Sequence, residues 1–241
     1  MNDQHIGFRL TYFFIIILEL IGEYQIDTNP MLRYMTKPML CIVLMLWYLH
    51  STWPSKDPID RLLLRAIVFS LFGDILLMFA SNNDSLFLSG LISFLTAHIW
   101  FIGAFLYTSK ETLPWWFIGK KSALPTLLLL IFSAAFDYWL FPYLGSLWPA
   151  IVIYSLVICR MAIGATNRYN RVPFKSYRSV LIGALLFVIS DSALAVSNFA
   201  FSFTGDRLVV MLTYALAQYF IVNGIIKQQE GKIEEMPVAA S

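Results

Sequence analysis

The sequence predicts an all-α polytopic membrane protein with eight transmembrane helices. Apolar residues make up 59% of the 241 positions and charged residues only 13%, and the mean hydropathy is +0.69. Soluble domains carry about a quarter charged residues. The apolar residues also form continuous runs of about 20 residues, the length that crosses roughly 30 Å of hydrocarbon as a helix. A β-barrel is disfavoured because its strands require alternating apolar and polar residues.

Eight such runs follow one another, with short breaks between them that contain residues typical of turns. We expect a single transmembrane domain over residues 1–241, with a short cytoplasmic tail at 227–241 and no room for a soluble domain. The breaks are Asn29-Pro30, Pro54-Ser55, Ser81-Asn82-Asn83-Asp84, Pro114, Phe141-Pro142 and Thr204-Gly205-Asp206. The predicted spans are about 8–24, 37–53, 62–80, 86–107, 122–141, 145–164, 176–198 and 207–226.

The first run has the length of a secretory signal, but its composition differs from that of a signal. It contains Glu19 and Glu23 and is followed by the polar stretch 24–29, with no small-residue cleavage site. We therefore expect this run to remain in the mature protein as the first transmembrane helix.

Lysine and arginine are distributed unevenly between the two sides of an eight-helix chain. One side holds 14 of the 17, and the other holds only Arg33, Lys37 and Arg207. An excess of positive residues marks the cytoplasmic side, so both termini are predicted to be cytoplasmic. The net charge of +2 follows from this topology and gives no indication of nucleic-acid binding. The 14 residues are Arg9, Lys56, Arg61, Arg65, Lys110, Lys120, Lys121, Arg160, Arg168, Arg171, Lys175, Arg178, Lys227 and Lys232.

Acidic residues inside the apolar runs are the main candidates for function. Asp74 interrupts the third run and Asp191 the seventh. A carboxylate in hydrocarbon costs several kcal/mol unless it faces the protein interior or is protonated. Both residues lie about two-thirds of the way from the cytoplasmic side, and Glu19 holds a similar place in the first run.

Other polar residues fall at a similar depth and are expected to share one cavity with the aspartates. His98 of the fourth run, and Tyr214 and Gln218 of the eighth, lie between mid-depth and the outer half. Lys37 and Asn198 are expected at the outer rim of this cavity.

Each candidate also has a purely structural interpretation. Asp74 could form a salt bridge with Lys37, and the neighbouring hydroxyl groups could hold Asp191. His98 by itself is a common kind of interhelical hydrogen bonder. Asp137, beside Tyr138, has the character of an interfacial residue.

Several kinds of site are excluded. We expect no metal, because of the three histidines only His98 lies well inside the membrane, and Cys41 and Cys159 lie in different spans at different depths. We expect no cofactor, because the chain lacks a P-loop and a dinucleotide fingerprint, and it has no Gly-x-Ser-x-Gly elbow. Of the possible catalytic groups, the pair of carboxylates, Asp74 and Asp191, remains. In a dry site one carboxyl group holds a proton while a better-solvated partner stays ionised, which suits cleavage of glycosidic or vinyl-ether bonds.

Five ordered segments carry a resemblance to a known family. They are Lys37-Pro38, Phe72-Gly-Asp-Ile-Leu-Leu77, Thr96-Ala-His98, Gly183 to Phe199 with Asp191 at its centre, and Met211-Leu-Thr-Tyr-Ala-Leu-Ala-Gln218. With these segments the chain resembles the YhhN-like lysoplasmalogenase family of eight-span membrane proteins, from about residue 37 to 226.

The resemblance implies hydrolysis of the vinyl-ether bond of a lysoplasmalogen, with a lysophospholipid substrate taken from the bilayer. The products would be a fatty aldehyde and glycerophosphoethanolamine or glycerophosphocholine. The family's two aspartates correspond to Asp74 and Asp191, and we expect both to be catalytic. We expect Asp191 to be the acid because its apolar neighbours make it drier, and Asp74 to stabilise the cation and orient water. Lys37 is expected to receive the phosphate. The pocket residues are expected to be Glu19, Lys37, His98, Asn198, Tyr214 and Gln218.

Two other classes of function remain open. A small proton-coupled transporter would use Glu19, Asp74 and Asp191 as a relay. The third and seventh runs hold equivalent places in two four-helix halves, and such a repeat occurs in transporters. In a non-catalytic lipid-binding protein, the aspartates would only tie helices together. The short loops favour the inner (plasma) membrane of a bacterium, and no feature specifies an oligomeric state.

Overall fold

A computed structural model describes residues 4–26, 28–52, 57–80, 83–108 and 111–235, with side chains from residue 5 to 231. Within these ranges the chain is helical, with one isolated β-bridge between Tyr107 and Thr112 and no strand. The predicted all-α class is confirmed. The long helices are α1 (Gln4–Tyr24), α2 (Met31–Thr52), α3 (Pro58–Met78), α4 (Asp84–Leu106), α5 (Ala123–Leu140), α6 (Trp148–Thr166), α7 (Phe174–Ala195) and α8 (Asp206–Glu235).

Seven of the described helices are long and apolar enough to cross a membrane, and α3 is the exception. With 21 residues, α3 is about 31 Å long at 1.5 Å per residue, which is also sufficient. Its composition differs because it carries Asp74 and, near its start, Asp60, Arg61 and Arg65. The exception therefore arises from charge and not from length.

Two helices extend well beyond the runs that hydropathy identified. The second begins at Met31, before the predicted start at residue 37, so Pro38 lies inside it. The last continues to Glu235, past the predicted end at residue 226. Lys, Gln and Glu favour helices but lower hydropathy, so hydropathy marks the apolar part of a helix and not its ends.

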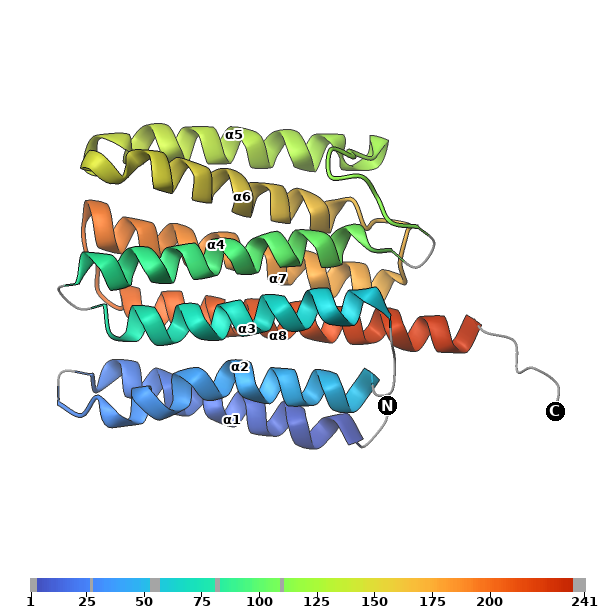
Figure 1. The fold of residues 1–241 in the computed structure, drawn as a ribbon, viewed down its shortest axis with the longest axis horizontal. Helices are drawn as coiled ribbons and strands as arrows, with labels where there is room; N and C mark the ends of the chain where they lie inside the picture. Colours follow the sequence, from blue (N-terminus) through green and yellow to red (C-terminus); the bar gives the residue numbers. More distant parts are fainter. Residues whose placement is uncertain (1–3, 27, 53–56, 81–82, 109–110, 236–241) are drawn as a thin grey trace.

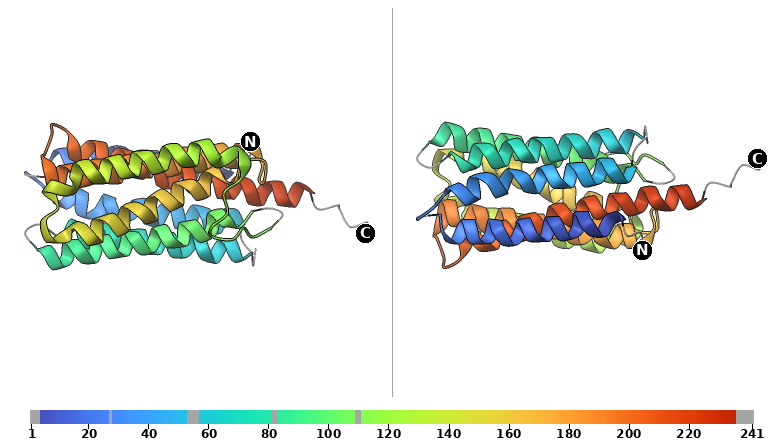
Figure 2. Two further views of the ribbon diagram at one scale, coloured as in Figure 1. Left: turned by 90° about the horizontal axis from the view of Figure 1, so that it is seen from above. Right: turned by 90° about the horizontal axis from the view of Figure 1, so that it is seen from below.

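The helices run alongside one another in a bundle (Figures 1 and 2), with α5 at one edge and α1 and α2 at the other. The start of α1 and the end of α8 lie at the same end of the bundle, as an even number of spans requires. We call the opposite end the distal end. That the distal end faces away from the cytoplasm remains a prediction from the lysine and arginine distribution. Of the residues used for it, Lys56, Lys110 and the side chain of Lys232 lie outside the described residues, as do the breaks Pro54-Ser55 and Ser81-Asn82.

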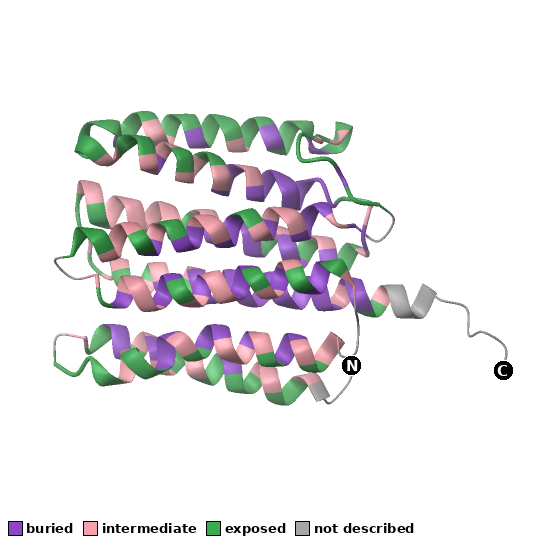
Figure 3. Cartoon of the chain, in the orientation of Figure 1, coloured by how far each residue is buried: buried purple, intermediate pink, exposed green. Residues whose placement is uncertain are grey.

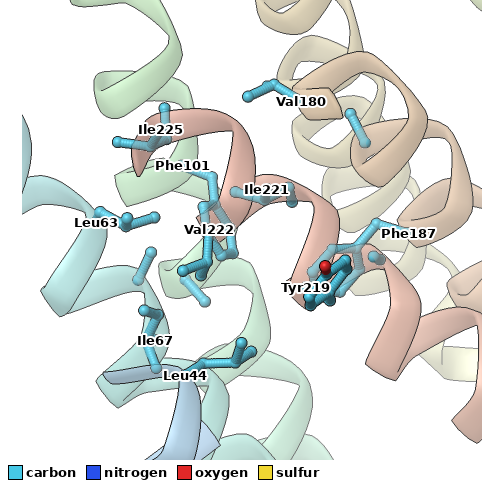
Figure 4. Packing of buried hydrophobic residues seen from close by; sticks show 14 of the residues in the cluster. Leu44, Leu63, Ile67, Phe101, Val180, Phe187, Tyr219, Ile221, Val222 and Ile225 are labelled. Carbon is cyan, nitrogen blue, oxygen red and sulfur yellow. The ribbon is translucent and has the colours of Figure 1, made fainter. Parts of the chain in front are cut away.

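The core is centred on α8. Of the most apolar window of α8, 67% is buried, against 11% for α5, and the same contrast is visible in Figure 3. In Figure 4, Ile221, Val222 and Ile225 of α8 lie among Leu63 of α3 and Phe101 of α4. The bundle therefore has a well-packed centre and a peripheral helix, α5, that is largely exposed.

A buried arginine fixes the connection after α6. Arg168 is fully buried, and its guanidinium donates to Gln228 Oε1 at 2.5 Å, to Ser176 Oγ at 3.1 Å and to the Phe105 carbonyl at 3.5 Å. Burial lowers the pKa of Arg168 to about 9, so the group is still charged at neutral pH. These contacts hold the connection to α4, α7 and α8.

The closest helix contact is between α7 and α8 and depends on glycine. A Cβ at Gly183 would lie 2.7 Å from the carbonyl oxygen of Ala217 and 2.9 Å from the backbone nitrogen of Ile221. At Gly224 it would lie 2.9 Å from the backbone nitrogen of Val180. Small residues of this kind let transmembrane helices approach closely.

We predict that Gly183→Ala destabilises the protein by about 1–3 kcal/mol, because the new methyl group meets backbone that cannot move away. The measurement is the thermal unfolding midpoint in detergent. Gly7→Ala in α1 is the matched control, since nothing lies within 4 Å of a Cβ there. Equal midpoints for the two variants would contradict the close α7–α8 contact.

Candidate functional site

Asp191 lies near the distal end of α7, where three helices converge. Its Oδ2 accepts a hydrogen bond of 2.6 Å from the Tyr154 hydroxyl of α6 and lies 3.6 Å from Nε2 of His98 in α4. His98 is fully buried, while 13% of the Asp191 side chain is exposed. The aspartate is therefore held among protein groups and remains accessible.

The geometry of His98 favours a proton at this site. Its Nδ1 is 2.6 Å from the carbonyl oxygen of Phe94, and a carbonyl only accepts, so Nδ1 carries a hydrogen. In the neutral ring Nε2 is then an acceptor, and it faces a carboxylate oxygen that is also an acceptor. Two facing acceptors repel unless one of them is protonated, so this arrangement favours a protonated carboxyl group at Asp191. At 3.6 Å the two atoms are not hydrogen-bonded to each other.

Asp74 lies in a different hydrogen-bonded group, deep between α2, α3 and α8. It is almost fully buried, and its Oδ2 accepts from the Tyr214 hydroxyl at 2.7 Å and from Cys41 Sγ at 3.5 Å. Gln218 Nε2 donates to the Tyr214 hydroxyl at 3.4 Å. Donors surround Asp74, whereas Asp191 also faces an acceptor.

Aromatic rings separate the two groups. The Phe187 ring lies edge-on to both His98, at 4.8 Å between centroids, and Tyr214, at 5.5 Å. Phe94 packs against Tyr214 at 5.7 Å. The sequence predicted one cavity shared by both aspartates. Instead, aromatic rings lie between the two groups. The prediction was based on the similar depth of the two aspartates, and depth does not show what lies between two residues.

A polar cavity of about 450 Å³ lies at the distal end. Lys37 and Asn198 line it, as predicted for a rim. Lys37 is buried and takes part in none of the ion pairs among the described residues. Asn198 lies in a π-helical turn, η4 (Val196–Ala200), a distortion that is frequent at functional sites. The other charged lining residues are Glu23, Arg33, Asp206 and Arg207.

Two smaller cavities have lining residues in common with each other, and one of them also with the polar cavity. One, of about 30 Å³, shares Asn198 with the polar cavity and is also lined by Tyr154 and Asp191. The other, of about 50 Å³, lies between α5, α6 and α7 and again includes Tyr154 and Asp191. We call it the α5 cavity. Most of its remaining lining is apolar. Asp191 therefore lines both small cavities and not the polar cavity itself.

The predicted site residues therefore fall into four groups, of which those of Asp74, Lys37 and Glu19 lie close enough to interact electrostatically. Glu19 of α1 accepts a hydrogen bond of 2.5 Å from Thr36 Oγ1 of α2, and its Oε1 has no partner. By position, the groups are Asp191 with His98, then Asp74 with Tyr214 and Gln218, then Lys37 with Asn198 at the polar cavity, and Glu19 with Thr36.

Two residues of the α5 cavity were not predicted. Tyr154 had no distinguishing signal, because a tyrosine in an apolar run is common. Asp137 was interpreted as interfacial, yet it lines the α5 cavity with Asp191. The depth rule that selected Asp191 would also have indicated Asp137, since both stand in the last third of helices that run in the same direction. Among the described residues, no group of three or more His, Cys, Asp or Glu could hold a metal ion.

Comparisons with known proteins agree over most of the chain. The model of the YhhN family matches residues 32–225, from α2 into α8. The chain is similar to lysoplasmalogenase TMEM86B of Mus musculus, with 30% identity over 202 residues, 79% of this chain and 73% of the mouse protein. It is also similar to lysoplasmalogenase of Mycobacterium tuberculosis, with 25% identity over 222 residues, 91% of this chain and 80% of that protein. No solved structure gives a significant match.

We predict that Tyr214→Phe lowers stability by about 1–3 kcal/mol, because it removes a donor from a buried carboxylate. The measurement is again the unfolding midpoint in detergent. Tyr138→Phe is the control, since Tyr138 is 86% exposed. If both variants unfold like the parent, the Tyr214–Asp74 hydrogen bond does not contribute to the fold.

Proposed function

The chain belongs to the YhhN family, and we propose that it is a membrane hydrolase that cleaves the vinyl-ether bond of lysoplasmalogens. The products are a fatty aldehyde and glycerophosphoethanolamine or glycerophosphocholine. Relatives from a mammal and a mycobacterium are named lysoplasmalogenase, which supports an enzyme of this kind. The observation that carries the proposal is Asp191, a carboxyl group that faces an acceptor nitrogen of His98 and lines two small, mostly apolar cavities, one of which shares Asn198 with the polar cavity.

In this proposal Asp191 is the general acid. It transfers its proton to the vinyl carbon that is not bonded to oxygen, and the ether oxygen stabilises the cation at the neighbouring carbon. Water adds to that carbon and loses a proton, and the hemiacetal breaks down to the aldehyde and the glycerol hydroxyl. Tyr154 donates to the Asp191 carboxylate after the transfer, whereas the acceptor Nε2 of His98 favours the return of a proton to Asp191. General acid catalysis of this kind contributes about 10²–10⁴-fold.

The cavities suit a lysophospholipid whose head group and hydrocarbon chain lie on opposite sides of Asp191. The head group occupies the polar cavity, where the Lys37 ammonium receives the phosphate. The vinyl ether lies at Asp191 beside the α5 cavity, and the hydrocarbon chain extends from there toward the bilayer on the side of α5, a helix that is largely exposed. The substrate then enters from the bilayer without crossing the packed core.

Asp74 acts as a positioning residue in this scheme. Its hydrogen bond fixes the Tyr214 hydroxyl, and the Tyr214 ring packs against Phe187, which in turn packs against His98. Asp74 thus helps to hold the His98 ring in position through Tyr214 and Phe187, and it does not contact the reacting atoms.

We predict that Asp191→Asn lowers aldehyde release from lysoplasmenylethanolamine by at least about 100-fold, because the amide cannot donate the proton. Asp74→Asn keeps an acceptor for Tyr214 and retains measurable activity. Purified protein in detergent is assayed, and each variant must elute and unfold as a folded species. Asp84→Asn, at the exposed start of α4, is the control. Equal losses for both aspartate variants would show that Asp74 also takes part directly.

We predict that Lys37→Gln raises KM by about tenfold or more and leaves kcat nearly unchanged, because a charged hydrogen bond to phosphate is worth about 1.5–3 kcal/mol. Steady-state kinetics in mixed micelles measure both constants. Lys121→Gln, at the opposite end of the bundle, is the control. A fall in kcat with KM unchanged would argue against phosphate binding by Lys37.

A further inference from the structure

The α5 cavity contains a second carboxyl group opposite the proposed acid. Asp137 comes from α5 and Asp191 from α7, and both line the same space of about 50 Å³. A cavity needs roughly 10–15 Å³ of such volume to hold one water molecule, so water fits there. Acid-catalysed addition of water requires a base that receives a proton from that water, and the residues described so far include no group assigned to that step.

The surroundings of Asp137 differ from those of Asp191. Its Oδ1 is buried and has no hydrogen-bond partner. The nearby hydroxyl groups of Ser133 and Ser155 bond to each other at 2.9 Å and line the same cavity. Buried acceptors nearly always have a partner, so this oxygen is suited to accept a hydrogen bond from water or a substrate hydroxyl.

Resting on the function proposed above, we propose that Asp137 is the general base that holds and deprotonates the water in the α5 cavity. Asp191 gives its proton to the vinyl carbon and becomes a carboxylate. The water oxygen then bonds to the cationic carbon, and its proton goes to the Asp137 carboxylate. When the hemiacetal breaks down, its hydroxyl proton passes to the Asp191 carboxylate as the C=O bond of the aldehyde forms. The bond from carbon to the glycerol oxygen breaks, that oxygen takes the proton from Asp137, and both aspartates are back in their starting states.

The two carboxyl groups have different roles because their neighbours differ. Asp191 faces the bare Nε2 of His98, an acceptor, which favours the protonated form of this carboxyl group. No histidine lines the α5 cavity beside Asp137, which has serine hydroxyl groups as its polar neighbours. Asp74 is not among the residues that line this cavity, and its Oδ2 is already bonded to Tyr214 and Cys41.

The experiment is hydrolysis of lysoplasmenylethanolamine in D₂O by parent and Asp137→Asn protein, with mass analysis of the substrate that is left. Asp137→Asn is expected to release aldehyde about 100-fold more slowly than the parent. In D₂O, Asp191 still transfers a deuteron to the alkene. Without a base the cation reacts slowly with water and instead returns to the alkene, which leaves deuterium on the vinyl carbon of the recovered substrate. The parent shows little exchange, and Asp191→Asn shows none.

Deuterium exchange into the substrate distinguishes a general base from a residue that only maintains the structure. Loss of the base slows hydration alone, whereas a distorted site would slow both protonation of the alkene and hydration. Asp137→Glu keeps the carboxylate and is expected to recover part of the rate, and it carries the test if Asp137→Asn does not fold. Asp84→Asn is the control for a lost carboxylate elsewhere. Parent-like release by Asp137→Asn, or slow release without exchange, overturns the role of Asp137 alone. No release by the folded parent overturns the proposed function as well.

Discussion

Hydrocarbon offers no hydrogen-bond partners, so the polar side chains of this bundle must find them within the protein, and many of those partners lie on α8. The helix meets its neighbours through polar groups at several levels along its length, and these contacts fix its rotation and its height. The contacts are Tyr214 to Asp74, Asn223 to Ser179, Gln228 to Arg168 and Gln229 to Asp60. Between these levels, α8 packs against α7 so closely that glycine is required at Gly183 and Gly224.

The periphery of the bundle is packed quite differently. α5 is largely exposed and packs chiefly on α6, so the α5 cavity lies between the fixed core and a helix with few tertiary restraints. Regions with few buried contacts open at low free-energy cost. Asp191 presents its carboxyl group to this cavity. Under the proposed function, the rigid half of the protein would orient the acid and the loosely packed half would admit the substrate.

The sequence predicted the fold class well because composition and run length follow directly from the thickness of the bilayer. It also predicted that Asp191 and His98 would lie close together, because the depth of each residue in the membrane can be counted along antiparallel helices. Depth leaves the rotation of each helix undetermined. For that reason Asp74 was predicted to share a cavity with Asp191, while Phe187 in fact lies between their groups, and Tyr154 was not predicted at all.

The two aspartates show why depth and residue type are insufficient to assign chemistry. Each interrupts an apolar run after a small residue, and each lies toward the distal end of its helix. The atoms that face them differ. Tyr214 and Cys41 both donate to Asp74, and such donors stabilise a carboxylate that keeps its charge and stays in place. His98 presents an acceptor to Asp191, and an acceptor favours the protonated form of the carboxyl group that it faces. A carboxyl group that only receives hydrogen bonds has no proton to give, whereas one that holds a proton at the edge of a cavity can transfer it to a substrate.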